Sequence, residues 1–227
     1  MLSRLYREKT ISRIEKKFKL LNLKKDIDVQ NFMNYRVLST IFVFFILLFT
    51  NKGYIYAPIL SIITYLSFEY ILDFKIKKRR EKLNYEAIFF FQVLILTLES
   101  GKNLQGGILL TCNSIDNEIS DEFKKTLNEV KYGKSLIEAL TDMKDRIPSE
   151  EINTVLLNIT QSALFGNNVI DSLNNQIDYL RDKRLLNIKA KINKMPIKIS
   201  VVSVVFIIPI ILLLILGPVL INYLLNL

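Results

Sequence analysis

Two carboxylate pairs, Asp121-Glu122 and Glu150-Glu151, are the residues whose spacing comes nearest to acid–base chemistry. Adjacent residues on a helix do not face each other, and acids are favoured near helix N-termini for electrostatic reasons. The sequence has no histidine and one cysteine, Cys112, which excludes histidine catalysis, Cys/His zinc sites and disulfides. Cys112 shares a predicted helical face with apolar residues, which indicates a buried structural thiol. We therefore expect a protein that is not an enzyme and that uses no cofactor or metal.

A short pattern recurs three times, around Gly101, Gly133 and Gly166, which are 32 and 33 residues apart. In each copy a polar residue follows the glycine, then Asn or Ser, then an aliphatic residue. Glycine can adopt the left-handed conformation past a helix end without steric cost, and Asn or Ser is a good N-cap for the next helix. Each copy therefore predicts a tight turn between two helices. Small residues should keep one side of the second helix thin: Gly107, Ala139 and Ser172.

Apolar residues recur at helical spacing on both sides of every predicted turn. We therefore expect three αα-hairpins that form a six-helix antiparallel bundle. A period of about 33 residues also occurs in TPR and ankyrin arrays, but their signature residues are missing here, which disfavours a solenoid. The predicted helices begin near Glu81, Leu104, Ile119, Leu136, Glu150 and Ile170.

Half of the residues are hydrophobic and 23% are charged, and the two kinds are segregated along the chain. The apolar segments 32–50 and 54–72 each approach the roughly 20 residues that a spanning helix needs. A short turn separates them, so we expect a transmembrane hairpin over 32–72. The last 29 residues carry no charged side chain and predict a transmembrane segment over 199–227. The expected fold is all-α, with three transmembrane helices and a helical domain over 73–198.

Prolines and a glycine interrupt the last part of the chain. Pro196 can break or kink the helix that leaves the domain, and Pro209 can kink the following segment. A straight helix over 199–225 would be about 40 Å long, against a hydrocarbon core of about 30 Å. We therefore expect it to tilt, kink or stop early, with Gly217-Pro218 as its end.

Positive residues crowd both ends of the predicted hairpin. Residues 1–35 hold nine Lys or Arg against four acids, and residues 75–82 hold six more Lys or Arg. The positive-inside rule predicts that the N-terminus and the helical domain are cytoplasmic and that the C-terminus is outside. Residues 1–31 are either a basic amphipathic helix on the membrane surface or a solvated basic tail. The net charge of +9 favours lipids rather than nucleic acid, because no basic stripe is interleaved with aromatic residues.

Several of these features, taken in order, resemble the F domain of the type II secretion system. The likeness covers roughly residues 81–220. With one such domain after N-terminal membrane helices, the chain is similar to the Tad-pilus branch, the TadB/TadC-like platform proteins. The matching residues are Leu-Glu-x-Gly at 98–101, Gly-Lys-Ser-x-x-Glu-Ala-Leu at 133–140, the turn at Gly166, Lys-Met-Pro-Ile-Lys at 194–198 and Leu-Gly-Pro at 216–218.

The resemblance implies a non-enzymatic inner-membrane platform protein of a Tad pilus or a type II secretion machine. Its helical domain would lie at the centre of a hexameric secretion ATPase. Its membrane part would meet pilin subunits, and a second platform protein or a second copy would complete an oligomer. The chain departs from the family pattern at two points. Leu164-Phe165 precedes the third glycine where relatives often have an acid, which argues against a cation site there, and Val202 replaces a proline, which predicts a straighter last helix.

Exposed charged turns are the expected site of ATPase contact. The alternative interpretation is that they are ordinary solvated helix caps. The candidate residues are Glu99, Lys102, Lys131 and Lys134. The alternative function is a small transporter or channel subunit that acts as an oligomer. Glu69 is the one acid near the predicted spans, and it lies about one turn from the inner end, where its carboxylate can reach the interface. This position disfavours an ion path.

Overall fold

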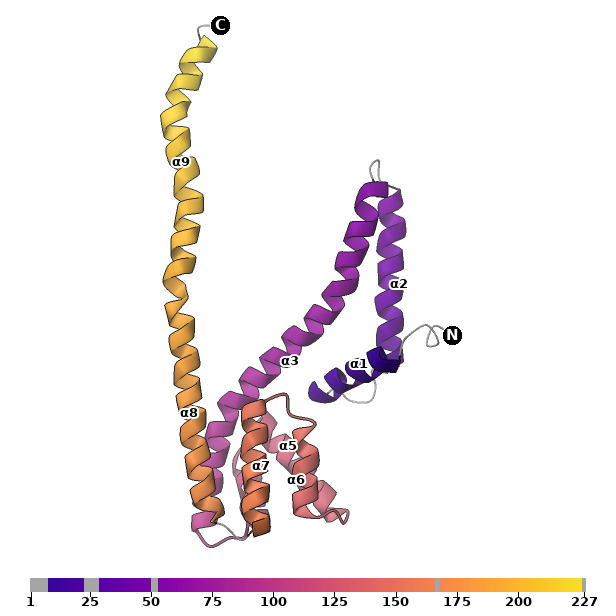
Figure 1. Cartoon of the computed structure of the whole chain (residues 1–227), viewed down its shortest axis with the longest axis vertical. Coiled ribbons are helices and arrows are strands. Elements are labelled where there is room, and N and C mark those ends of the chain that lie inside the picture. Colours follow the sequence, from indigo (N-terminus) through magenta and orange to yellow (C-terminus); the bar gives the residue numbers. More distant parts are fainter. Residues whose placement is uncertain (1–7, 23–28, 50–52, 166–167, 226–227) are drawn as a thin grey trace. The chain divides into compact units, whose positions relative to one another are not determined.

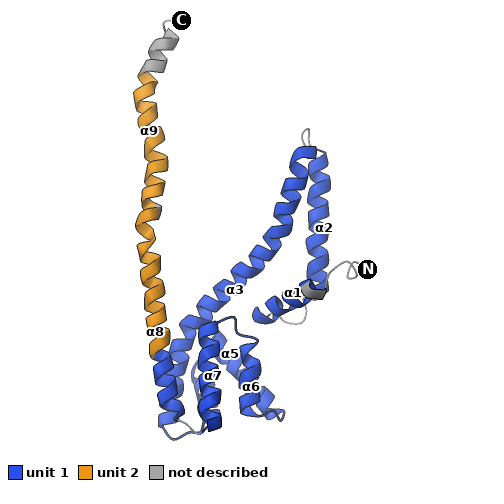
Figure 2. Ribbon diagram, viewed as in Figure 1, with its two compact units in different colours: residues 1–177 blue, residues 178–227 orange. Residues whose placement is uncertain are grey.

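The computed structural model describes residues 8–22, 29–49, 53–165 and 168–225, which contain helices and connecting turns but no strand. The chain divides into two compact units, residues 1–177 and 178–227 (Figure 2). The expected all-α class is confirmed. Figure 1 gives the order of the helices, which are α1 (Glu8–Leu20), α2 (Val29–Leu48), α3 (Gly53–Glu99), α4 (Leu104–Ser114), α5 (Glu118–Lys131), α6 (Leu136–Lys144), α7 (Glu150–Phe165), α8 (Val169–Asn193) and α9 (Met195–Leu225).

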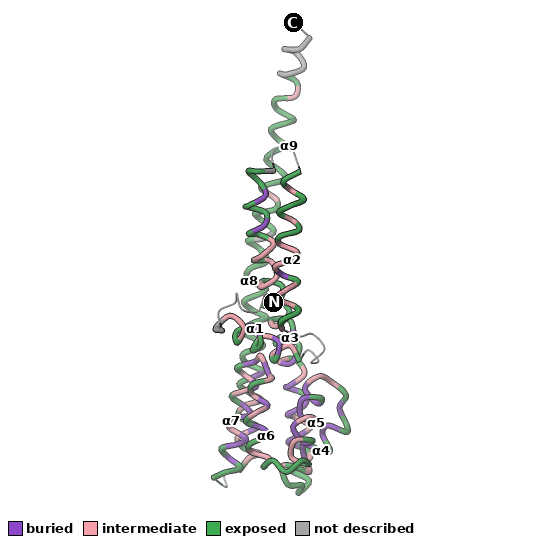
Figure 3. Tube along the Cα trace, turned by 90° about the vertical axis from the view of Figure 1, so that its right-hand side faces the viewer, coloured by how far each residue is buried: buried purple, intermediate pink, exposed green. Residues whose placement is uncertain are grey.

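The first unit contains a membrane hairpin, which is α2 together with residues 53–72 of α3. The two helices contact each other and run side by side in Figure 1. Their outward apolar side chains are exposed, and Figure 3 shows α2 mostly in the exposed and intermediate colours. Within the described residues, three stretches are long and apolar enough to cross a membrane, as predicted: α2, part of Tyr54–Glu99, and part of Val169–Pro218.

Helix α3 continues without a break from the membrane hairpin into the helical domain, which we define as residues 79–99 of α3 together with α4 to α7. The sequence predicted two separate helices here, one over 54–72 and one beginning near Glu81. The structure instead shows one helix of 47 residues. Its middle part is rich in Lys, Arg, Glu and Leu, which are good helix formers, and contains no glycine or proline that would end it. The membrane hairpin and the helical domain therefore share a continuous element.

The core of the helical domain is built around the last part of α3, which contacts α4, α5 and α7, while α6 packs against α5 and α7. Phe90 stacks on Phe123 with ring centroids 4.5 Å apart, and both rings are fully buried. Gly107 lets α4 lie close to α3, because a Cβ atom there would be 2.8 Å from Cδ2 of Leu98. The predicted thin side of this helix is confirmed at Gly107.

The predicted turns have the expected local geometry where they are described. Gly101 and Gly133 have φ values of +86° and +101°, in the left-handed region that favours glycine. Asn103 caps α4 by accepting a hydrogen bond from the amide of Gly106 at 2.8 Å, and Ser135 caps α6. Gly166 lies outside the described residues.

The C-terminal part of the chain agrees with the prediction at Pro196 and differs from it at Gly217-Pro218. Helix α8 ends at Asn193 and α9 begins at Met195, so the helix changes next to Pro196, as expected, and Pro209 lies inside α9. Gly217-Pro218 does not end the helix, because α9 continues to Leu225. An apolar helix in lipid has no alternative partner for its backbone, which favours continuation through a proline. Since α8 is divided between the two units, the six-helix bundle and its third hairpin stay predictions.

Candidate functional site

The distal turns, residues 99–103 and 131–135, join α3 to α4 and α5 to α6. Figure 1 shows both at the end of the first unit that is remote from the membrane hairpin. All four charged residues proposed from the sequence are exposed: Glu99, Lys102, Lys131 and Lys134. The structure therefore brings the four residues to one end of the helical domain.

Lys134 differs from the other three because it holds its own turn together. Its Nζ atom lies 2.9 Å from Oε2 of Glu129 on α5 and 2.7 Å from Oδ2 of Asp142 on α6. Hydrogen bonds to Asp142 and Glu129 raise the pKa of Lys134, and the same lysine lowers the pKa of Asp142. Lys134 thus links two helices, and changing it would alter the turn as well as any contact made there.

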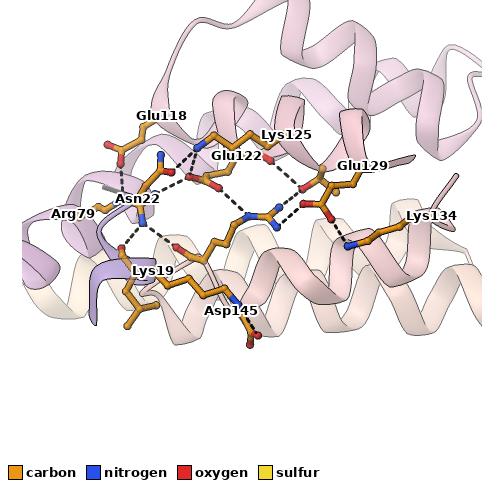
Figure 4. Close-up of polar contacts among 12 residues, drawn as sticks. Lys19, Asn22, Arg79, Glu118, Glu122, Lys125, Glu129, Lys134 and Asp145 are labelled. Atoms are coloured by element: carbon orange, nitrogen blue, oxygen red, sulfur yellow. Dashed lines mark hydrogen bonds and ion pairs between the residues drawn. The ribbon is translucent and has the colours of Figure 1, made fainter. Parts of the chain in front are cut away.

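A second charged region, the junction cluster, lies at the other end of the helical domain, where α3 leaves the membrane hairpin. It consists of Arg79, Glu118, Glu122 and Arg146, and the first three of these are labelled in Figure 4. Arg79 on α3 is only 7% exposed and donates from Nε to Oε1 of Glu118 at 2.6 Å and from Nη2 to Oε1 of Glu122 at 2.9 Å. Its Nη1 donates to the backbone carbonyl of Arg146 at 2.9 Å. One guanidinium therefore ties α3 to α5 and to the segment between α6 and α7.

Glu122 is the centre of this cluster and is completely buried. Besides Arg79, its carboxylate faces Nε of Arg146 at 3.4 Å and Nζ of Lys125 at 3.2 Å. Arg146 also reaches Oε1 of Glu129 at 2.7 Å. A buried carboxylate needs such partners, because removing them leaves a charge in a low-dielectric environment. The charges of the cluster all have partners only when α3, α5 and the α6–α7 segment are packed together.

The electrostatics of Glu118 follow from the same arrangement. Burial alone would raise its pKa, but hydrogen bonds from Arg79 and Lys82 outweigh burial and lower the pKa below its ordinary value of 4.5. Glu118 thus stays ionised in the cluster at neutral pH.

Helix α1 packs against the base of the membrane hairpin, the end at which α2 begins. Ile14 and Phe18 are buried in a small core with Met33 of α2 and Leu72 of α3. The rings of Phe18 and Phe32 make an edge contact with centroids 5.2 Å apart. The apolar face that was expected to meet either lipid or water therefore meets protein.

Charges reinforce this packing. Lys17 on α1 lies 2.6 Å from Oδ1 of Asp73 and 3.6 Å from Oε1 of Glu69. The other oxygen of Glu69 is 3.6 Å from Nη2 of Arg36, which is 4% exposed and whose guanidinium carbon lies 3.7 Å from the ring centroid of Tyr65. Glu69 is therefore shared between α1 and α2 at the base of the hairpin.

The end of α1 also contacts the helical domain, as Figure 4 shows. The backbone carbonyl of Leu20 accepts a hydrogen bond from Nη1 of Arg79. Lys19 forms an ion pair of 3.2 Å with Asp145, and Asn22 accepts a hydrogen bond of 2.7 Å from Lys125. Helix α1 is thus fixed to the membrane hairpin on one side and to the junction cluster on the other.

The two carboxylate pairs and Cys112 lie in environments that do not favour catalysis. Asp121 is exposed while Glu122 is buried, so the two carboxylates point to different environments. Glu151 accepts hydrogen bonds from Ser149 and Asn84 near the start of α7. Cys112 is buried, and burial raises the pKa of its thiol to about 11, which disfavours the nucleophilic thiolate. Among the described residues, no group of three or more Cys, Asp or Glu side chains could hold a metal ion.

The junction cluster was missed by reasoning from the sequence. The sequence predicts Arg79 to be one of several cations at the membrane surface, and Glu122 to be one of the acids near a helix start. One signal could have identified Glu122: it lies between Ile119, Phe123 and Thr126 on the face of α5 that turns into the core. A carboxylate on a core-facing stripe predicts a buried cation as its partner.

Comparison with known proteins agrees with this architecture. No curated protein and no solved structure matches the chain significantly. The family model of the type II secretion system (T2SS), protein F, matches residues 90–217, which is more than half of the 227-residue chain. The matched region runs from the core of the helical domain through α8 and most of α9. Together with three membrane-length helices, this match shows that the chain belongs to the protein F family of inner-membrane platform proteins found in type II secretion and type IV pilus systems.

Proposed function

We propose that this protein is the platform of a Tad-type pilus or a related secretion machine, and that it couples a cytoplasmic secretion ATPase to pilin assembly without catalysing a reaction itself. The observation that carries the proposal is the junction cluster. Arg79 and Glu122 tie the helical domain to α3, and α3 continues into the membrane hairpin. A rotation of the helical domain would therefore be transmitted to the membrane hairpin through the continuous helix α3 and the buried ion pairs.

The proposed topology has residues 1–31 and the helical domain, within 73–198, in the cytoplasm. Residues 32–72 and 199–227 span the membrane, and the C-terminus is outside. The cations of α1 and of the first part of α3 after the hairpin support this orientation through the positive-inside rule. Pilin subunits would contact the membrane helices, and a second copy or a second platform protein would complete the assembly.

The distal turns are the proposed contact with the hexameric ATPase. They lie at the end of the helical domain remote from the membrane hairpin, and this is the end that projects furthest into the cytoplasm in the proposed topology. Glu99, Lys102 and Lys131 are the residues best suited to test the contact, since all three are exposed. Lys134 is less suitable, because it also bridges Glu129 and Asp142.

The full-length chain in detergent, incubated with the secretion ATPase from the same cell, provides the test. We expect the two proteins to co-purify, and we expect Lys102→Glu combined with Lys131→Glu to abolish the association. The matched control is Lys183→Glu with Lys189→Glu, which makes the same charge change on exposed residues of α8. Equal loss in both double variants would point to net charge and against docking at the distal turns. Absence of binding by a well-folded wild-type chain would contradict the coupling role.

The competing function, a transporter or channel subunit, would use charged groups along the membrane helices. The charges that the structure places in the hairpin, Arg36 and Glu69, are paired with each other near its base. Glu69 is also paired with Lys17 of α1. This arrangement supports a structural role for the pair, so the platform function is the one we put forward.

A further inference from the structure

Exposed tyrosine side chains mark two levels of the membrane hairpin. Tyr54 and Tyr56 are exposed near the start of α3, and Tyr70 is exposed near the base, with Tyr35 of α2 exposed close to the start of that helix. At 1.5 Å per residue, Tyr54 and Tyr70 are about 24 Å apart along α3, which approaches the roughly 30 Å of a hydrocarbon core. Exposed tyrosines at such a separation are typical of the two membrane interfaces. The base of the hairpin therefore lies at one headgroup layer.

Helix α1 lies at this same level, because Phe18 packs against Phe32 of α2 and shares a core with Leu72 of α3. Phe18 is only 7% exposed, and Ile14 only 2%. An amphipathic helix normally binds a membrane by burying its apolar face among the acyl chains. In this protein that face is already occupied by the hairpin, so α1 can meet the bilayer only through its polar face.

The cations of α1 whose side chains the structure describes fall into two groups. Lys17 and Lys19 are used in ion pairs with Asp73 and Asp145. Arg13 and Lys16 are exposed and lie one turn apart on the side of α1 that faces away from Ile14. Four exposed cations on α3 begin about one turn beyond the base of the hairpin: Lys75, Lys77, Lys78 and Arg80.

We propose that α1 is a lipid-docking helix whose outward cations, Arg13 and Lys16, bind the phosphate headgroups of anionic phospholipids together with the exposed cations at residues 75–80 of α3. Flexible Lys and Arg side chains can reach headgroups while their stems stay against protein. An anionic leaflet attracts such cations over about one Debye length, and α1 lies within that distance of the interface. A lipid surface fits this patch better than an acidic protein, because the patch lies beside the base of the hairpin, where the hairpin would enter the membrane.

The proposal has a mechanical consequence. Lys17 links α1 to Glu69 and Asp73 of the hairpin, and Lys19 links it to Asp145 of the helical domain. Headgroups that hold α1 would therefore also steady the junction between the membrane and the domain. The inference rests on the membrane placement within the proposed function, but it does not depend on ATPase binding.

The absence of tryptophan from the sequence makes a direct test possible. Tyr35→Trp places a single fluorophore at the base of the hairpin, where the native side chain is exposed. The full-length chain is reconstituted into phosphatidylcholine vesicles that contain brominated phosphatidylglycerol or, separately, brominated phosphatidylcholine. Comparing the quenching by the two brominated lipids gives the relative affinity of the protein for the anionic lipid.

We expect the anionic lipid to be preferred, and we expect Arg13→Gln with Lys16→Gln to lower the preference by about fivefold or more. The matched control, Lys102→Gln with Lys131→Gln, removes two exposed cations from the distal turns and should leave the preference unchanged. High salt should weaken the preference. An unchanged preference in the α1 variant, or equal loss in both double variants, would overturn the proposal. So would a preference that persists in high salt, since an uncharged contact would then account for it.

A second fluorophore position checks which face of α1 meets the lipid. In Phe18→Trp the indole should be shielded from brominated lipids, because the native ring is buried against the hairpin. Quenching as strong as that of Tyr35→Trp would show that α1 inserts its apolar face and would overturn the proposal. Neither an unchanged lipid preference nor quenching of the Phe18→Trp indole would affect ATPase co-purification. The failure of this inference can therefore be told apart from the failure of the proposed function.

Discussion

The junction cluster and the distal turns are built from the same residue types, but they differ in burial. At the junction, Glu122 is completely buried and Arg79 nearly so, and each faces several partners from different helices. At the distal turns, Lys102 and Lys131 are exposed. Charged groups that are buried and mutually satisfied hold helices in a fixed arrangement, whereas exposed charges are available to a binding partner. In the proposed function, the junction end of the helical domain transmits motion and the distal end receives it.

The largest effect is expected at the centre of the junction. Glu122→Ala would leave Arg79 and Arg146 without their shared carboxylate and should lower the free energy of unfolding by about 3–5 kcal/mol. Thermal and denaturant unfolding of the full chain in detergent measures this change. Glu99→Ala at a distal turn is the control and should change stability by less than about 0.5 kcal/mol. Similar losses in the two variants would remove the distinction between the two ends.

Close packing of α4 on α3 supports the first distal turn and should be the next most sensitive feature. Gly107→Val places a branched side chain where even a Cβ atom would be 2.8 Å from Leu98, so we expect a loss of about 1–3 kcal/mol. Gln105→Val introduces the same side chain at an exposed position of α4 and should cost much less. If both variants unfold at the same temperature, the close approach at Gly107 does not contribute to stability.

Acid should weaken the junction through Glu118. Because its pKa is lowered in the folded protein, its contribution to stability is complete above its ordinary value of 4.5 and is lost as the pH falls below that value toward the folded pKa. We expect Glu118→Gln to flatten the loss of stability in this acidic range, measured as melting temperature against pH. Glu150→Gln, at an exposed helix start, should keep the wild-type slope. A wild-type slope in Glu118→Gln would mean that other groups determine the acid response.

The smallest effect on global stability is expected at Lys134, since its ion pairs are exposed to solvent. Lys134→Gln should instead act locally, because the link between Glu129 and Asp142 across the turn is lost. Hydrogen exchange of the amides at 133–136 should become faster, whereas Lys131→Gln should leave it unchanged. Equal exchange in both variants would show that Lys134 does not hold the turn.

Local features of the fold could be predicted from the sequence because their causes are local. The helices of the domain followed from apolar spacing, and the turns at Gly101 and Gly133 followed from glycine together with an N-cap two residues later. The continuity of α3 differs from the prediction, because the change from apolar to basic composition indicates a boundary although no residue there ends a helix. Composition can change along a single helix when its surroundings change from lipid to water.

Which residues pair in the junction cluster could not be predicted, because its members are far apart in the sequence. Arg79 and Glu122 are separated by 43 residues, and Glu122 and Arg146 by 24. No spacing rule connects such positions, and each residue has an ordinary local explanation as a juxtamembrane cation, a helix-start acid or a loop arginine. Only the packing of α3, α5 and the α6–α7 segment brings their charges together.

One comparison tests the coupling role most directly. Cells that carry wild-type protein, Glu122→Gln, or Lys102→Glu with Lys131→Glu are assayed side by side for ATPase co-purification and for filament assembly or secretion. The distal variant should lose both, because the ATPase no longer binds. The junction variant should retain the ATPase, which also shows that its helical domain is folded, but should lose assembly. Normal assembly by a Glu122→Gln protein that still binds the ATPase would contradict transmission through the junction cluster.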